Sequence, residues 1–445
     1  MLEVLSRSWP LLFGVFLMLV GNGMQGTLLG IRGGIEGFST SQMSWIMSTY
    51  FLGFLGGSLL APRLIQRVGH VRVFAALGSL ISALLILYPV LPEWVAWATF
   101  RLLIGFGFSG VYVTAESWLN NSSTNETRGK ALSLYMIMQS GGIIVGQALL
   151  NVADPAGFLL FVIPSVLVSL SFTPVLLSVA PAPAFESTRP MSILKLMRMS
   201  PLGCFGTFAM GGVFSALFGM ASVWGGLEGL TVAQISGFVA AIYFGGLVVQ
   251  YPIGQLSDRM DRRQLILVIA LVGAFVMMIA AALDLPYALL LGVATVIGGV
   301  ANPLYSLFIS HTNDYLDSSE MAAASGGLLF LNGCGAFIGP LITGWAMTRL
   351  GPNGFFLYIG VLLVAITFYT AWRMMRREAP VATGAMAVVP PSAGVVAMEA
   401  AMEVASEAVP PPEEEIPGEE IPGEEAPETS GTAEETEPQR ESTGS

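Results

Sequence analysis

Twelve apolar runs, each about as long as a membrane-crossing helix, constrain the fold of this chain more than any other feature. A helix crosses a roughly 30 Å hydrocarbon core in about 20 residues. The chain is 54% hydrophobic and 11% charged, with a mean hydropathy of +0.71, and soluble proteins carry about 25% charge. We therefore predict a multi-pass membrane protein with spans near 9–30, 43–62, 72–91, 93–117, 129–152, 156–178, 201–224, 231–253, 264–283, 285–309, 321–345 and 353–373.

Basic residues are concentrated in the loops on one side of these runs. With the amino end inside, only Arg32 and Arg349 lie outside, and Arg101 lies within a span. Short loops rich in Lys and Arg stay in the cytoplasm. We therefore expect an inner-membrane protein with both termini in the cytoplasm and the lipid bilayer as its surroundings.

The chain repeats itself at a step of 193 positions, which indicates an internal duplication. The step places Tyr50 on Tyr243, Gly105 on Gly298, Tyr112 on Tyr305 and Gln139 on Asn332. Duplicated halves with marked residues at matching positions are typical of alternating-access transporters.

A charged turn, GQLSDRMDRR from Gly254 to Arg263, separates the eighth and ninth runs, and a shorter copy surrounds Arg67. The turn resembles the signature loop of the major facilitator superfamily, with Asp261 in place of the usual second glycine.

Further stretches carry the same resemblance. RLLIGFG from Arg101 is similar to that family's fourth-span motif, ETRGK ending at Lys130 to its following loop, and GAFIGPLITG from Gly335 to its eleventh-span pattern. AESWLN from Ala115 additionally resembles the YcaD-like bacterial branch.

The resemblance implies an all-α membrane protein of 12 transmembrane helices in two pseudo-symmetric six-helix bundles. We expect bundles at 1–178 and 201–377, a cytoplasmic linker at 179–200 and a disordered acidic tail at 378–445. Residues 379–445 hold fifteen of the thirty carboxylates and are rich in proline, so this tail buries too little apolar area to offset its ordering entropy. A short helix around Met398 to Ala408 stays open, as does an unknown cytoplasmic partner for the tail.

The charged turns are expected to form a cytoplasmic gate. In the family, the turn at Asp258 lies beside the start of the fifth span, where Arg128 could pair with it, so we interpret the turn as a latch between the halves. The alternative is ordinary positive-inside charge that fixes topology. The candidate gate residues are Arg67, Arg128, Asp258, Arg259, Arg262, Arg263, Asp317 and Glu320.

Two charged residues lie inside the fourth run. Arg101 and Glu116 share one helical face with Gly105, Ser109 and Tyr112. Charges at membrane depth are costly and usually functional, so Glu116 is our proton-coupling candidate and Arg101 a substrate contact. The alternatives are an interfacial Glu116 that reaches water and an Arg101 that packs against helix carbonyls.

Polar residues inside the runs are expected to line a substrate cavity, although such residues also join helices to one another. Phe and Met residues are expected to face lipid or to pack. The cavity candidates are Asn22, Gln25, Tyr50, Arg101, Tyr112, Gln139, Tyr243, Asn302, Tyr305 and Asn332.

No catalytic motif is present, and the two cysteines lack metal-ligand spacing. We expect no enzyme activity, no cofactor, no metal, no nucleic-acid partner and a monomer. The predicted function is a secondary transporter that exports a small amphipathic or metabolic solute by alternating access, coupled to protons. The alternatives are a proton symporter for a small polar or anionic nutrient, and a transporter-like sensor or docking protein.

Overall fold

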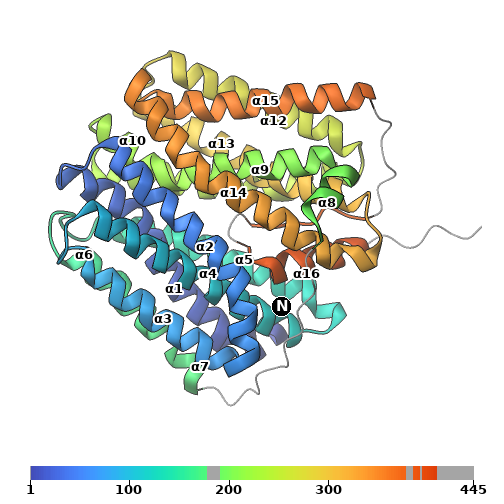
Figure 1. Cartoon of the computed structure of the whole chain (residues 1–445), viewed down its shortest axis with the longest axis horizontal. Coiled ribbons are helices and arrows are strands. Elements are labelled where there is room, and N and C mark those ends of the chain that lie inside the picture. Colours follow the sequence, from blue (N-terminus) through green and yellow to red (C-terminus); the bar gives the residue numbers. More distant parts are fainter. Residues whose placement is uncertain (1, 178–190, 377–383, 391–392, 408–445) are drawn as a thin grey trace, which may run out of the picture. The chain divides into compact units, whose positions relative to one another are not determined.

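Helices make up nearly all of the chain that the computed structural model describes, residues 2–177, 191–376, 384–390 and 393–407. The N-half contains α1 (Leu2–Ile35), α2 (Thr40–Val68), α3 (His70–Leu87), α4 (Trp94–Asn121), α5 (Asn125–Leu149), α6 (Leu159–Ser171) and α7 (Thr173–Leu177). The C-half contains α8 (Ile193–Met199), α9 (Pro201–Ser215), the π-helical turn η1 (Ala216–Met220), α10 (Ala221–Leu227), α11 (Val232–Ser257), α12 (Arg262–Ala282), α13 (Tyr287–Asn313), α14 (Ser318–Leu350) and α15 (Gly354–Arg376). A last helix, α16 (Val395–Glu407), follows (Figure 1).

Among the described residues, twelve helices are long and apolar enough to cross a membrane. Two of these spans are composite: α6 and α7 together form the sixth, and α9, η1 and α10 form the seventh. The predicted twelve-span, all-helical fold is confirmed.

Helices at corresponding positions of the two halves begin with the same capping motif. Ser39 caps α2 in a capping box with Gln42, and Thr231 caps α11 in a capping box with Gln234, 192 positions later. Such caps satisfy the unpaired N–H groups of a helix start. The duplication is therefore visible in how the helices begin.

Glycines set the helix crossings in both halves. A Cβ on Gly105 would meet the backbone of Tyr50, and a Cβ on Gly298 would meet the backbone of Ile242. The α2–α4 crossing and the α11–α13 crossing are thus equivalent close approaches. Small residues allow such contacts between membrane helices.

At one end, hydrogen bonds join the two halves directly. Asn151 of α5 donates to the Ser236 hydroxyl of α11 at 3.1 Å, and the Ser48 hydroxyl of α2 donates to the Phe337 carbonyl of α14. The opposite end carries the loops with Arg67, Arg128 and Arg259, and we call it the basic end. There, α16 lies between α5 and α14, that is, between the halves (Figure 1).

Part of the segment expected to be a disordered tail is ordered. Residues 384–390 and 393–407, the C-terminal segment, pack against the membrane helices, because apolar residues such as Met386, Val389 and Met402 are buried there. The acidic, proline-rich repeat begins only after this segment, and it lies outside the described residues. The helix left open near Met398 is present, as α16.

Candidate functional site

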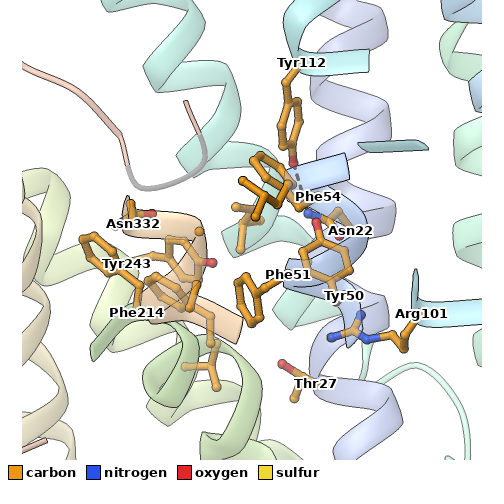
Figure 2. A pocket seen from close by; sticks show the side chains of 18 of the residues that line it. Asn22, Thr27, Tyr50, Phe51, Phe54, Arg101, Tyr112, Phe214, Tyr243 and Asn332 are labelled. Carbon is orange, nitrogen blue, oxygen red and sulfur yellow. Dashed lines mark hydrogen bonds between the residues drawn. The ribbon is translucent and has the colours of Figure 1, made fainter. Parts of the chain in front are cut away.

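A central cavity of about 140 Å³ lies between the two halves. Figure 2 shows its two walls: Asn22, Tyr50, Phe51, Phe54, Arg101 and Tyr112 come from the N-half, and Phe214, Tyr243 and Asn332 from the C-half. A molecule in this cavity would therefore contact both halves.

Arg101 is the charged group of this cavity. Its side chain is 4% exposed, donates to Gln25 Oε1 at 2.9 Å and lies 4.6 Å from the centre of the Tyr50 ring. Its Nε has no hydrogen-bond partner, and no carboxylate within the described part of the chain forms an ion pair with it. A buried cation without a counter-ion is costly, so the geometry favours an anion or a strong acceptor beside it. Gln25 supports Arg101 and does not line the cavity.

Symmetry-matched residues meet in the cavity only in part. Tyr50 and its repeat partner Tyr243 both line it, from opposite halves. Tyr112 also lines it and accepts a hydrogen bond from Asn22 at 3.1 Å. Its repeat partner Tyr305 is fully buried against Phe214, with the ring centres 5.5 Å apart, and does not line the cavity.

Four phenylalanines of the cavity wall were not predicted. Phe51, Phe54, Phe214 and Phe218 line the cavity, so the expectation that Phe residues face lipid or only pack is wrong for these four. Phe218 lies in η1, and π-helical turns often occur at functional sites. Only their positions in the sequence could have indicated that these residues line the cavity, since Phe51 follows Tyr50 directly and Phe214 and Phe218 are one helical turn apart.

A second cavity of about 540 Å³ adjoins the first and shares Ile143 and Tyr243 with it. It contains the candidates Gln139 and Asn302, and the C-terminal segment forms part of its wall through Met386, Val389, Ala401 and Val404. Asn332, in the central cavity, donates to the Thr207 carbonyl at 3.2 Å.

Glu116 faces the C-terminal segment rather than the central cavity. It is 2% exposed, and its Oε1 accepts from the Gly394 N–H at 2.8 Å and the Tyr135 hydroxyl at 3.2 Å. Its Oε2 accepts from the Ala397 N–H at 3.2 Å. The Glu116 carboxyl oxygens therefore accept hydrogen bonds from backbone N–H groups at the start of α16, where such groups have no partner within the helix.

The two latch candidates both contact the C-terminal segment. Asp258 Oδ1 accepts from the Met386 N–H at 2.8 Å, and Arg128 lies 2.7 Å from Glu403. The structure thus brings Asp258 and Arg128 to one segment from opposite halves, with the segment between them.

The remaining gate candidates are divided between buried and exposed positions. Arg262 pairs with Asp314, and its other amino group donates to the Gly384 carbonyl. Arg263 pairs with Asp261 at 3.0 Å.

Asp261, which replaces the family's glycine, caps α12 by accepting from the Arg263 N–H at 2.9 Å. Burial raises the pKa of Asp261, but hydrogen bonds and charge from Arg263 outweigh it and lower the pKa below its usual value.

Arg259, Arg67 and Asp317 are exposed at the basic end, whereas Glu320 pairs with Lys195 of α8. No group of three His, Cys, Asp or Glu side chains that could hold a metal occurs in the described ranges.

Comparison with known proteins identifies the relatives of this chain. The sequence model of the Major Facilitator Superfamily matches residues 11–326 and 228–394. The "Uncharacterized MFS-type transporter YcaD" of Escherichia coli O17:K52:H18 is 28% identical over 373 residues, which are 82% of this chain and 94% of that protein. The Salmonella arizonae protein of the same name is 27% identical over 356 residues, 78% of this chain and 91% of that protein.

Two solved structures share the fold. The nucleoside transporter NupG, as its D323A mutant, superposes with a TM-score of 0.71 at 15% identity, covering 82% of this chain and 99% of that one. A bacterial homolog of the human lysosomal transporter Spinster, inward-facing and unoccupied, gives 0.63 at 13% identity, with 91% and 99% covered.

Proposed function

This chain belongs to the Major Facilitator Superfamily and is a multi-pass membrane transporter, and from this premise we propose that it moves a small amphipathic solute by alternating access. We place the basic end in the cytoplasm, because loops rich in Lys and Arg are retained there. The proposal also places the protein in the inner membrane, as a monomer. The two six-helix bundles, 1–178 and 201–377, would rock about the central cavity.

The observation that carries the proposal is the unpaired Arg101 in an aromatic cavity. Its guanidinium would bind the acidic or acceptor group of the solute by charge-assisted hydrogen bonds. Phe51, Phe54, Phe214 and Phe218 would pack on an apolar or aromatic body. The resulting substrate class is a small aromatic or branched apolar acid.

Coupling and direction come from other residues. Glu116, buried near the basic end, is the group proposed to exchange a proton with the cytoplasm. The exporter-like glycine–proline pattern at Gly335 to Gly344 favours export. Import of an anionic nutrient with a proton is the second candidate, and Arg101 supports it equally well.

A latch between Asp258 and Arg128 is part of the proposal. In the state whose cavity faces outward, the C-terminal segment would be absent from the closed mouth, and the two side chains could then meet. Substituting Asp258→Asn is expected to lower transport and to raise cytoplasmic labelling of cysteines placed in the cavity. Unchanged values of both would remove the latch.

The substrate class is tested by thermal unfolding of the purified protein. The probes are aromatic carboxylates, their neutral amides and aliphatic carboxylates. Aromatic carboxylates are expected to raise the unfolding temperature of the wild type and of Arg32→Gln, a control arginine outside the cavity, but not of Arg101→Gln. A shift that persists in Arg101→Gln, or that the amides reproduce, contradicts the class.

Direction and coupling are tested in proteoliposomes with an imposed pH gradient, using the solute that the unfolding assay identifies. Export predicts accumulation in inside-out vesicles when their lumen is acidic. A sensor is distinguished by removal of residues 379–445, since a carrier continues to transport and a sensor loses its output.

A further inference from the structure

The C-terminal segment follows a re-entrant path at the basic end. Ala387 N–H donates to the Ser310 hydroxyl at 2.9 Å and Val389 N–H to the Ser306 hydroxyl at 3.1 Å. Ser306 lies one turn of α13 further from the basic end than Ser310, so residues 384–390 run inward in an extended form.

The segment then returns as a helix. Gly394, at the start of α16, contacts Glu116 within α4, whereas Glu403, near the end of α16, pairs with Arg128 at the start of α5. The two arms of the segment meet at the basic end, where the Ala385 N–H donates to the Ala405 carbonyl at 2.8 Å. The segment is therefore a hairpin inserted between the halves.

The segment is held by specific polar contacts on both halves. Five backbone N–H groups of the segment donate to side chains of the membrane helices or, for Met386, to Asp258 directly after α11. The donors are Met386, Ala387, Val389, Gly394 and Ala397. Buried backbone groups need such partners, and each net hydrogen bond contributes about 0.5–1.5 kcal/mol. The helices thus supply the partners that an inserted peptide requires.

Apolar burial accompanies these hydrogen bonds. Met386, Met398 and Met402 are at most 6% exposed, and Ala401 lines the second cavity. Met side chains adapt to irregular surfaces. The central cavity, about 140 Å³ with the segment in place, is smaller than the roughly 300–1,000 Å³ of typical ligand sites.

We propose that the C-terminal segment is an autoinhibitory plug that closes the cytoplasmic mouth and must leave before a solute enters or exits there. The proposal rests on the solute path assigned above, but its test uses no solute. A failed test of the substrate class would therefore leave the plug standing, and a failed labelling test would leave the substrate class standing.

The experiment measures the labelling rate of one cysteine beneath the segment with a small water-soluble maleimide in inside-out vesicles. Cys204 and Cys334 are first replaced by Ala. Val113→Cys is the reporter, because Val113 is buried on α4 beside Gly394. Gln264→Cys, exposed at the start of α12, is the control reporter.

Two truncations are compared with the full chain. Ending the chain after Arg376 removes the segment, whereas ending it after Glu407 keeps the segment and removes the acidic repeat. Labelling of Val113→Cys should rise at least about tenfold only in the shorter chain, the change expected if about 1.4 kcal/mol favours docking. Gln264→Cys should label equally in all three.

A synthetic peptide of residues 384–407, added to the shorter chain, should slow labelling again, and a scrambled peptide should not. Equal rates of Val113→Cys in the full and shorter chains overturn the plug. A rise in both truncations also overturns it, since the acidic repeat would then be responsible.

A point variant covers the case in which the shorter chain folds poorly. In the full chain, Ala401→Glu places a charge in the second cavity and should speed labelling of Val113→Cys, whereas Glu407→Gln, at the exposed end of α16, should not. Unchanged labelling in folded Ala401→Glu counts against the plug.

Discussion

Glu116 accepts a hydrogen bond from the backbone N–H of Gly394, 2.8 Å away and 278 residues later in the chain. The contact connects the buried carboxylate of the fourth span to the start of a helix that lies outside the twelve spans. The proton exchange proposed for Glu116 and the proposed docking of the C-terminal segment therefore involve the same side chain.

Substituting Glu116→Gln is expected to abolish transport driven by a pH gradient while solute exchange without a gradient persists. The amide cannot exchange a proton, although it has nearly the same shape. Tyr135→Phe is the matched control, since it removes one hydrogen bond to the carboxylate and leaves its charge. Full gradient-driven transport in Glu116→Gln would remove this residue from the proton path.

Substituting Arg101→Met should eliminate transport without loss of stability. Replacing a buried, unpaired charge by an apolar side chain of similar length is expected to change the free energy of unfolding by zero to about 2 kcal/mol in the stabilising direction. Arg32→Met should instead destabilise, because Arg32 pairs with Glu36 at 2.6 Å and donates to the Pro155 carbonyl. Thermal unfolding of both variants checks this, and equal losses would contradict it.

Two glycines of α13 should respond in opposite directions to the same substitution. In Gly298→Ala the new methyl group would meet the backbone of Ile242, at a cost of about 1–3 kcal/mol. In Gly292→Ala the methyl group has no neighbour within 4 Å, so the variant should be neutral or up to about 1 kcal/mol more stable. Unfolding temperatures decide, and a similar loss in both would show that the crossing is not tight.

Docking of the C-terminal segment should weaken as the pH rises. Burial raises the pKa of Glu399 in α16, Glu403 raises it further and Arg128 lowers it. The docked segment therefore binds the proton more tightly than the free segment, so docking is strongest below the ordinary pKa of Glu and weakens above it. The labelling rate of Val113→Cys, divided by that of Gln264→Cys at the same pH, should increase as the pH rises above the ordinary pKa of Glu.

Glu399→Gln should make that labelling slower at neutral pH and less dependent on pH. Glu407→Gln, exposed at the end of the same helix, serves as the control. If Glu399→Gln retained the full pH dependence of Val113→Cys labelling, a group other than Glu399 would be responsible for that dependence.

The twelve spans could be predicted because a helix that crosses the bilayer must be apolar over about 20 consecutive residues, which the sequence shows directly. Every run near 20 residues became a helix or a composite span, and even the capping residues Ser39 and Thr231 recur 192 positions apart, within one residue of the repeat step. The break in the seventh span at Ala216–Met220 was not foreseen, since nothing in its apolar sequence distinguishes a π-helical turn from an α-helix.

The cavity could be predicted only where polarity marked it. Asn22, Tyr50 and Arg101 are polar residues in apolar spans and can be recognised in the sequence. Phe51 and Phe218 also line the cavity, but phenylalanine is equally common at positions that face lipid. Which way an aromatic side chain points depends on helix rotation, and that is set by packing between helices far apart in the chain.

The ordered structure of the C-terminal segment could not be predicted, because an acidic repeat follows it directly in the sequence. Averaged with the acidic repeat that follows, residues 384–407 resemble a solvated tail, although Met386, Met398 and Met402 are buried. Partners such as Glu116 and Asp258 lie more than a hundred residues away, so no local pattern could indicate them.

Tyr50 and Tyr243 stand on opposite walls of the central cavity, one from each half. The size of a bound molecule consequently limits how closely the halves approach. A compound that retains an acidic group for Arg101 but carries a body too bulky for both tyrosines would act as a wedge. It would bind, hold the bundles apart and stop the cycle, which offers a route to inhibitors before the natural cargo is known.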